Sequence, residues 1–334
     1  MASALPETCL VTGVAGFIGS HLAERLLSEG YSVVGVDCFT PSYSRERKEA
    51  NLAPLQRTPG FRFIEADLAT MDLDALLKGV AYLFHQAGQA STWTSWGENF
   101  PSYVRLNIQV TQRLLEAARR AEGLRKLIFA SSSSIYGDSS DLPLRETSPL
   151  QPVSPYGVTK AAAEFLVRLY ARNLVPTVCL RYFSVYGPRQ RPDMVFYRFL
   201  DAIYASRPVE IYGDGEQTRD FTFVADIVQA NLLAMTHGEP GSCFNIGGGS
   251  RASLNRCLAM LRHISGRDPQ VVYRQPQHGD VRNTWADTTA ARTVLGFRPR
   301  VSLESGLQTE DEWFRTVVLR GSPDSAKVSG GSRA

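Results

Sequence analysis

The first half of the chain alternates short apolar runs with longer segments whose apolar residues recur every three to four positions. Such runs predict buried strands, and the longer segments predict helices packed against them. The expected strands are 9–11, 31–36, 61–64, 82–85, 124–130 and 177–181. The expected helices are 17–28, 73–77, 98–121 and 155–173. This alternation predicts an α/β fold, with a doubly wound parallel sheet between two layers of helices.

The turn between the first strand and the first helix carries Gly13, Gly16 and Gly19, in the spacing G-x-x-G-x-x-G. A strand that turns sharply into a helix presents free backbone N–H groups and the positive end of the helix dipole. Together these suit a diphosphate. A glycine triplet alone is weak evidence, and the strand–turn–helix context is what favours a Rossmann-type phosphate site.

The second strand ends on Asp37. The first βαβ unit of a Rossmann-type fold places its ribose-binding carboxylate at about this point. An acid here repels a 2′-phosphate, which favours NAD over NADP. The basic residues Arg45, Arg47 and Lys48, in what is expected to be the next loop, weaken that preference.

The pattern changes after Tyr182, where glycine, proline, arginine and aromatic residues crowd into Y-F-S-V-Y-G-P-R-Q-R-P-D-M. Beyond it we expect helices at 195–206, 224–235, 254–265 and 303–319, a strand running into a turn at 211–217, and a strand at 243–246. We therefore predict a Rossmann domain over 1–183 and a smaller mixed α/β substrate domain over 184–320, with part of 220–247 returning to the first domain. The polar end of the chain, 321–334, is predicted to be disordered.

Tyr156 and Lys160 lie four residues apart at the start of a predicted helix, so both side chains fall on one face. A nearby ammonium favours phenolate and lowers the tyrosine pKa towards the working pH. Alone, Y-x-x-x-K is more often a surface pair. Here the upstream strand runs into Ser131–Ser134, which can offer a hydroxyl to the same oxygen. A Ser–Tyr–Lys relay beside a nicotinamide predicts oxidation of a secondary alcohol by hydride transfer.

Two isolated polar residues have ordinary structural explanations. His85 has no partner at metal-ligand spacing and is expected to be a packed strand histidine. Asn107 interrupts the apolar side of helix 98–121, where its amide either braces a neighbouring loop or lies at the solvent edge. No metal site is predicted. The run Gly247–Gly249 lacks the ending of a P-loop and is expected to be a turn.

Composition narrows the function further. The 334 residues are 43% hydrophobic, and 36 basic against 33 acidic residues leave a net charge of +3, which does not favour nucleic acid. The five cysteines are scattered and odd in number, so buried thiols in a reducing, cytoplasmic compartment are expected. The N-terminus lacks the regions of a signal peptide, and no apolar run approaches a membrane span.

Together the motifs resemble the extended short-chain dehydrogenase/reductases, and within them the nucleotide-sugar epimerases and dehydratases. The resemblance rests on T-G-x-x-G-F-I-G, Asp37, Asp67-Leu68, the serines before I-Y-G, and Y-G-V-T-K. It covers residues 8–318 and extends to R-Y-F-S-V-Y-G-P and T-R-D-F-T-F-V-A-D. It implies a UDP-sugar substrate, tightly bound NAD+, and a homodimer formed through helices 98–121 and 155–173.

The resemblance also implies roles for individual residues. The catalytic residues would be Ser132, Tyr156 and Lys160. The cofactor would be bound by Gly13, Gly16, Phe17, Ile18, Gly19, Asp37, Asp67, Leu68, Ala87, Gln89, Asn107, Tyr156, Lys160 and Tyr182. The substrate would be bound by Ser132, Ser133, Ser134, Tyr156, Ser184, Arg191, Arg219 and Asp280, with Arg219 on the diphosphate and Asp280 on the uridine side.

The positions after the catalytic serine bear on the reaction. Dehydratases and uronate decarboxylases of this family carry one or two acids where Ser133 and Ser134 stand. A hydroxyl cannot replace that acid or base, which disfavours dehydration and assisted decarboxylation and leaves 4-epimerisation. The residues Ser184 and Gln277 depart from the asparagine and arginine usual in UDP-glucose epimerases and resemble the UDP-glucuronate 4-epimerases.

In those enzymes, small hydroxyl residues and an arginine surround the C6 carboxylate, which here implies Ser133, Ser134, Ser184 and Arg191. Without the resemblance, Arg191 facing solvent would be an equally good explanation. We expect NAD-dependent conversion of UDP-glucuronic acid to UDP-galacturonic acid. The alternatives are 4-epimerisation of UDP-glucose or another UDP-hexose, and decarboxylation of UDP-glucuronate. A non-catalytic NAD-binding regulator is disfavoured, because the Ser–Tyr–Lys set is complete.

Overall fold

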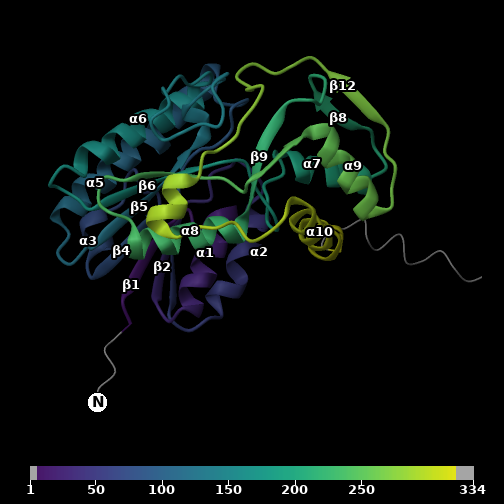
Figure 1. The fold of residues 1–334 in the computed structure, drawn as a ribbon. Helices are drawn as coiled ribbons and strands as arrows, with labels where there is room; N and C mark the ends of the chain where they lie inside the picture. The colour runs from purple at the N-terminus through teal and green to yellow at the C-terminus, as the bar shows by residue number, and fades with distance from the viewer. Residues whose placement is uncertain (1–5, 321–334) are drawn as a thin grey trace, which may run out of the picture.

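The main sheet has seven parallel strands in the order β10-β6-β5-β4-β1-β2-β3 (Figure 1). The structure is a computed structural model that describes residues 6–320. The segment 321–334, which was predicted to be disordered, lies outside the described residues. The strands are β1 (Thr8–Thr12), β2 (Ser32–Asp37), β3 (Phe61–Glu65), β4 (Val80–His85), β5 (Lys126–Ser132), β6 (Thr177–Tyr182) and β10 (Cys243–Ile246). The predicted doubly wound α/β fold is confirmed.

Helices cover both faces of this sheet (Figure 1). One face carries α3 (Leu73–Leu77), α5 (Val110–Arg120) and α6 (Pro155–Tyr170). The other carries α1 (Phe17–Ser28), α2 (Arg45–Gln56) and α8 (Val224–His237). The period-two alternation of a strand explains this burial on both sides, since Cys9 and Val11 pack with the α1 side and Leu10 with the α5 side.

The segment predicted as one helix at 98–121 changes its winding along its length. It runs through the 3₁₀ turn Gly97–Asn99, α4 (Phe100–Tyr103), the π-helical turn Val104–Gln109 and α5. Asn107 lies inside the π-helical turn and is buried. The Thr111 hydroxyl donates to the Asn107 carbonyl at 2.6 Å. A π-bulge of this kind is frequent at functional sites, which sequence periodicity cannot reveal.

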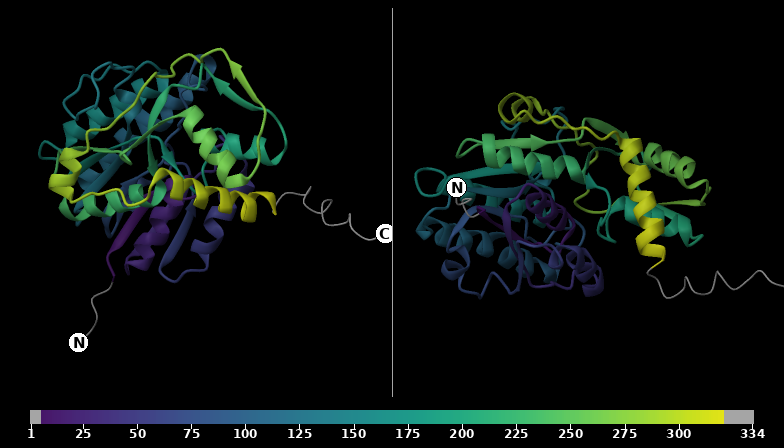
Figure 2. Two further views of the ribbon diagram at one scale, coloured as in Figure 1. Left: turned by 45° about the vertical axis from the view of Figure 1, so that its right-hand side comes forward. Right: turned by 90° about the horizontal axis from the view of Figure 1, so that it is seen from below.

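A smaller lobe packs beside the carboxyl ends of the strands (Figure 2). Its strands are β7 (Val185–Tyr186), β8 (Val209–Tyr212), β9 (Thr218–Phe223), β11 (Ser250–Ser253) and β12 (Val271–Arg274). Its helices are α7 (Val195–Tyr204), α9 (Leu254–Ser265) and α10 (Leu303–Trp313), and α10 packs against α9 and β9. Short turns at Ser133–Ile135, Ala291–Leu295 and Phe314–Leu319 complete the described elements.

Two details differ from the sequence prediction. The strand expected to start at 211 and run into a turn starts two residues earlier, at Val209, and ends at Tyr212, where Gly213 and Gly215 adopt positive φ in the predicted turn. The second half of the helix expected over 303–319 is π-helical from Phe314. Both differences arise where local backbone conformation departs from the period that the apolar residues indicate.

The glycine run after β10 is the turn that was predicted. Asp220 is buried beside it and accepts hydrogen bonds from the Gly248 and Ala286 backbone N–H groups at 2.9 and 3.0 Å. A Cβ atom on Gly248 would lie 1.9 Å from the Phe221 carbonyl oxygen, so only glycine fits. The run therefore serves close packing against β9.

Candidate active site

A cavity of about 510 Å³ opens at the carboxyl ends of β1, β4 and β5 and extends into the smaller lobe. This is the point where strand order reverses, the usual ligand site of doubly wound sheets. Every predicted site residue except Asn107 lines it. These residues are Gly13, Gly16, Phe17, Ile18, Gly19, Asp37, Asp67, Leu68, Ala87, Gln89, Ser132, Ser133, Ser134, Tyr156, Lys160, Tyr182, Ser184, Arg191, Arg219 and Asp280.

The glycine turn fits a diphosphate on steric grounds. Gly13 has φ of +69°, and a Cβ on it would lie 2.8 Å from the Ala87 Cα. A Cβ on Gly19 would lie 2.2 Å from the Gly13 carbonyl oxygen. Helix α1 begins at Phe17 after Gly16, and no side chain caps its first turn. The N–H groups and the dipole of α1 therefore face the cavity without a competing cap.

Asp37 is held in place at the end of β2. Its Oδ2 accepts from the Ala15 N–H at 3.1 Å and its Oδ1 from the Phe39 N–H at 2.9 Å. These bonds fix the carboxylate at the cavity wall beside the glycine turn. Each carboxylate oxygen has a further lone pair, so the group retains the capacity to accept from a ribose hydroxyl.

The basic residues after Asp37 already have partners. Arg45 forms two hydrogen bonds of 2.8 Å with Glu65, and the Arg47 guanidinium lies 4.7 Å from the centre of the Tyr197 ring. The Lys48 ammonium donates to the Thr40 carbonyl at 2.7 Å and lines the cavity. The Arg45 and Arg47 side chains therefore contact other protein groups. This makes binding of a 2′-phosphate, and so of NADP, less favoured.

Ser132, Tyr156 and Lys160 come from two neighbouring elements. Ser132 is the last residue of β5, and its Oγ accepts from the Ser134 N–H at 3.1 Å. Tyr156 and Lys160 lie in the first turns of α6, where the Ser154 hydroxyl caps the Gly157 N–H at 3.1 Å. The end of β5 positions Ser132, and the capped start of α6 positions Tyr156 and Lys160. All three side chains therefore line the same cavity.

The electrostatics of these groups follow from burial. Burial raises the pKa of the Tyr156 hydroxyl, while its hydrogen bond with Ser132 and the positive charge of Arg191 act in the opposite direction. Burial lowers the pKa of the Lys160 ammonium to about 8, opposed by the negative charge of Glu164. The ammonium donates to the Ala130 carbonyl and lies 4.4 Å from the centre of the Phe129 ring.

A buried ion pair behind these residues was not predicted. Glu164 and Arg181 have side-chain exposures of 0% and 1% and form a contact of 2.5 Å. The Ser131 hydroxyl donates to Glu164 at 2.6 Å, and Arg181 donates to the Tyr136 hydroxyl at 2.6 Å. The spacing Tyr156, Lys160, Glu164 is the signal that could have found it, since all three share one helical face.

Asn107 lies behind the cavity and braces the loop that flanks it. Its Oδ1 accepts from the Gln89 N–H at 2.8 Å, and its Nδ2 donates to the Gln89 carbonyl and to Thr159, both at 2.9 Å. Asn107 thus connects the loop after β4 with α6.

His85 is buried and bridges the hydroxyls of Thr12 and Thr111 at 2.9 and 3.0 Å.

Arg191, which the resemblance implies in a carboxylate pocket, is already paired with an acid in this structure. Its Nε and Nη2 donate to the two carboxylate oxygens of Asp193 at 2.9 and 2.8 Å. Its Nη2 also donates to the Ala90 carbonyl at 2.9 Å. Ser133, Ser134 and Ser184 line the same cavity. Asp193 was missed, although it lies two residues after Arg191 in R-P-D-M.

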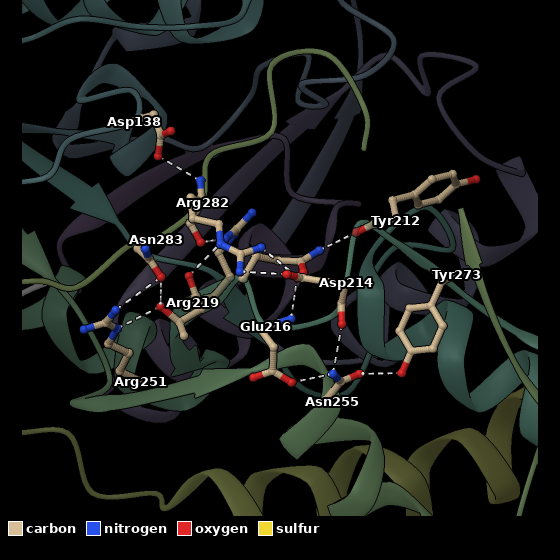
Figure 3. Close-up of polar contacts among 12 residues, drawn as sticks. Asp138, Tyr212, Asp214, Glu216, Arg219, Arg251, Asn255, Tyr273, Arg282 and Asn283 are labelled. Atoms are coloured by element: carbon tan, nitrogen blue, oxygen red, sulfur yellow. Dashed lines mark hydrogen bonds and ion pairs between the residues drawn. The ribbon is translucent and has the colours of Figure 1, made fainter. Parts of the chain in front are cut away.

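Ion pairs lie at and around another part of the cavity wall, where Arg219 and Asp280 line it. Figure 3 shows Arg219 and the neighbouring polar contacts. Arg219 pairs with Asp280, so the two residues predicted to contact separate parts of a nucleotide contact each other. Nearby, Arg282 donates to both carboxylate oxygens of Asp214 at 2.6 and 2.9 Å, and its backbone N–H donates to Asp138 at 2.8 Å. The segment 279–282 thereby joins the two lobes.

Two aromatic residues of the cavity wall, Trp93 and Tyr212, were not assigned from the sequence. The rings of Trp93 and Tyr212 have centres 5.1 Å apart, and the Arg198 guanidinium lies 5.3 and 5.1 Å from those centres. All three line the cavity. The rings meet edge to face at 69°. The face of an aromatic ring with a neighbouring cation suits a nucleobase.

Within residues 6–320 no group of three or more His, Cys, Asp or Glu side chains could hold a metal ion. All five cysteines are free thiols. Among the described residues, no helix combines the length and apolar character that a membrane span requires.

The chain belongs to the NAD dependent epimerase/dehydratase family, whose model matches residues 9–247. The relative "Uncharacterized UDP-glucose epimerase YtcB" of Bacillus subtilis (strain 168) is 42% identical over 316 residues, covering 92% of this chain and 98% of the relative. The UDP-glucuronate 4-epimerase of Thermodesulfobacterium geofontis (strain OPF15) is 36% identical over 317 residues, covering 92% and 96%.

The fold is similar to that of the UDP-glucuronic acid 4-epimerase from Bacillus cereus, solved in complex with UDP-glucuronic acid and NAD. The TM-score is 0.90 at 41% identity, covering 93% of this chain and 99% of that one. The predicted family and the predicted dependence on NAD are confirmed.

Proposed function

We propose that the protein is an NAD-dependent epimerase that converts UDP-glucuronic acid to UDP-galacturonic acid through a 4-keto intermediate. The observation that carries the proposal is the sugar end of the cavity, where Arg191 and hydroxyl side chains line the space beside Tyr156. A guanidinium with several hydroxyl donors suits a carboxylate. The likeness to the Bacillus cereus enzyme, solved with this sugar nucleotide and NAD, supports the same reading.

In this proposal, Ser132 and Tyr156 hold the C4 hydroxyl, and the Tyr156 oxygen receives its proton. The positive charge of the Lys160 ammonium would favour the phenolate, against the burial that raises the pKa of Tyr156. NAD+ held by the glycine turn and Asp37 supplies hydride transfer from and back to C4. Between the two hydride transfers the 4-keto sugar rotates in the cavity, so that C4 is reduced from its other face.

Residues that do not touch C4 have supporting roles in the proposal. Arg219 and Asp280 contact the nucleotide, which requires their ion pair to open when the diphosphate binds. Leu68 and Asp67 border the adenine, while Ala87, Gln89 and Tyr182 flank the nicotinamide half. Asn107 acts through Gln89.

A second candidate is 4-epimerisation of UDP-glucose. It is favoured by the Asp193 carboxylate, which neutralises Arg191, and by the printed name of the Bacillus subtilis relative. Initial rates on UDP-glucuronic acid and UDP-glucose, measured over a range of concentrations, test the choice. The proposal expects a higher kcat/KM for the uronate. A higher value for UDP-glucose would favour the second candidate.

We also propose a cytoplasmic homodimer with two domains per subunit. The Rossmann domain would span 1–183 together with part of 220–247, and the substrate domain the rest of 184–320. The placement of α8 and β10 against the main sheet supports this division.

The dimer is supported by an apolar stripe on α6, formed by Val158, Phe165 and Leu169, whose exposed fractions are 47%, 56% and 54%.

Replacing Phe165 by aspartate is expected to convert the dimer to monomer, because two desolvated carboxylates would face each other across the symmetric interface. Sedimentation velocity at micromolar concentration measures the change. The matched control is Val294→Asp, which changes an equally exposed apolar residue on the opposite face of the sheet and should leave a dimer. A wild-type protein that sediments as a monomer would contradict the proposal.

A further inference from the structure

The loop that carries Arg191 is fastened on two sides. On one side Arg189 donates to Glu24 and Ser20 of α1 at 2.6 and 3.1 Å, and His21 bonds to the Pro188 carbonyl at 2.9 Å. On the other side Arg191 donates to the Ala90 carbonyl. The loop therefore has a defined position between the cofactor helix and the loop after β4.

Only part of the Arg191 guanidinium is hydrogen-bonded to the residues that the structure describes. Its hydrogen bonds within residues 6–320 involve Nε and Nη2, which bind Asp193 and Ala90, and none involves Nη1. Both residues of the Arg191–Asp193 pair line the cavity. The two parallel N–H···O bonds fix the plane of the guanidinium, and a planar fork of this kind gives orientation as well as attraction.

We propose that Asp193 is a positioning residue that holds the Arg191 guanidinium so that a 4-keto uronate keeps its carboxylate. The inference rests on the proposed function and deepens it. A 4-keto uronate is a β-keto acid. Its loss of CO₂ breaks the C5–C6 bond, places the electron pair on the C4 carbonyl oxygen as an enolate, and ends with a solvent proton at C5. This requires the C5–C6 bond to align with the π-system of the ketone.

A carboxylate held in one place resists that alignment, whereas a mobile guanidinium would follow the carboxylate as the ring changes shape. The Asp193 side chain is 43% exposed, so its contribution to folding is small. Its effect is to limit the rotamers of a long side chain next to the reacting sugar. Asp193 thus acts on the fate of the intermediate more than on its formation.

The test is Asp193→Asn, incubated with UDP-glucuronic acid and followed by ¹H NMR. An amide cannot accept both guanidinium N–H bonds. We expect the fraction of UDP-pentose and UDP-4-keto-pentose among the products to rise on the order of tenfold, a modest effect for a lost orienting contact. The KM for the uronate should not increase, because Arg191 keeps its charge. Arg191→Lys, which keeps the charge without the fork, should raise the same fraction.

The matched control is Glu24→Gln, which makes the same acid-to-amide change at Arg189, outside the cavity. It should leave the pentose fraction at the wild-type value, because both Arg191–Asp193 hydrogen bonds are retained and Arg189 still bonds to Ser20. An unchanged fraction in Asp193→Asn, with wild type active on the uronate, would overturn this inference alone. A wild type inert on UDP-glucuronic acid but active on UDP-glucose would overturn the proposed function and this inference with it.

Discussion

Tyr156→Phe is expected to lower turnover about 10³-fold or more, within the range typical of a lost general acid–base group. The variant removes one oxygen from a half-buried ring that lines the cavity, and it leaves Ser132 and Lys160 in place. In the proposed function the phenolic oxygen accepts the C4 proton, and phenylalanine cannot accept it. Bound NAD should remain, because the glycine turn and Asp37 are unchanged.

Turnover is measured with saturating UDP-sugar, and NAD content is measured after denaturing the purified protein. The control is Tyr273→Phe, which removes an exposed hydroxyl of the smaller lobe whose partner among residues 6–320 is Asn255, at 3.2 Å. It should retain wild-type turnover. Retention of more than about a tenth of the wild-type rate by Tyr156→Phe would refute the assignment of the base.

The second large effect concerns stability. Glu164→Gln should lower the free energy of unfolding by about 3–5 kcal/mol, because it leaves the buried Arg181 guanidinium without its counter-charge. Ser131 would lose its charged acceptor at the same time. Denaturant unfolding, monitored by circular dichroism, measures the change from the shift in midpoint at constant slope.

The matched control is Glu29→Gln, which breaks the Arg25–Glu29 pair on the surface of α1, where the two side chains are 47% and 44% exposed. An exposed pair at i, i+4 contributes little, so the midpoint should not move measurably. If both variants unfold at the same midpoint, the Glu164–Arg181 pair does not have the structural importance argued from its burial.

Regular spacing made much of the fold predictable. The six strands and four helices expected in the first half all exist, because alternating and 3.6-residue periods report directly on burial. Helix α2 was not predicted, since its sequence R-E-R-K-E-A-N-L-A-P-L-Q is mostly charged and polar. Strands β7, β9, β11 and β12 were not predicted. Strands β7, β11 and β12 have two to four residues, too few for a readable period. Strand β9 buries the polar residues Asp220 and Thr222, so its sequence lacks the apolar run typical of a buried strand.

The cavity was predictable where a local motif positions the residue. Gly13, Asp37, Tyr156 and Lys160 each follow from a strand end or a helix start, and all line the same space. Pairings between distant segments were not predictable. The contact of Arg219 with Asp280 joins residues 61 positions apart. The spacing on α6 could indicate Glu164, but its partner Arg181 comes from another element, β6. The partnership of Arg191 with Asp193 depends on the conformation of a loop, not on a period.

The identity of the product formed from UDP-glucuronic acid tests the proposed function most directly. Purified protein is incubated with UDP-glucuronic acid without added reductant, and ¹H and ¹³C NMR spectra are recorded until they no longer change. The account predicts UDP-galacturonic acid in equilibrium with the starting sugar nucleotide, with the C6 carboxylate signal retained. UDP-xylose or its 4-keto precursor as the main product, or no change while UDP-glucose is converted to UDP-galactose, would contradict it.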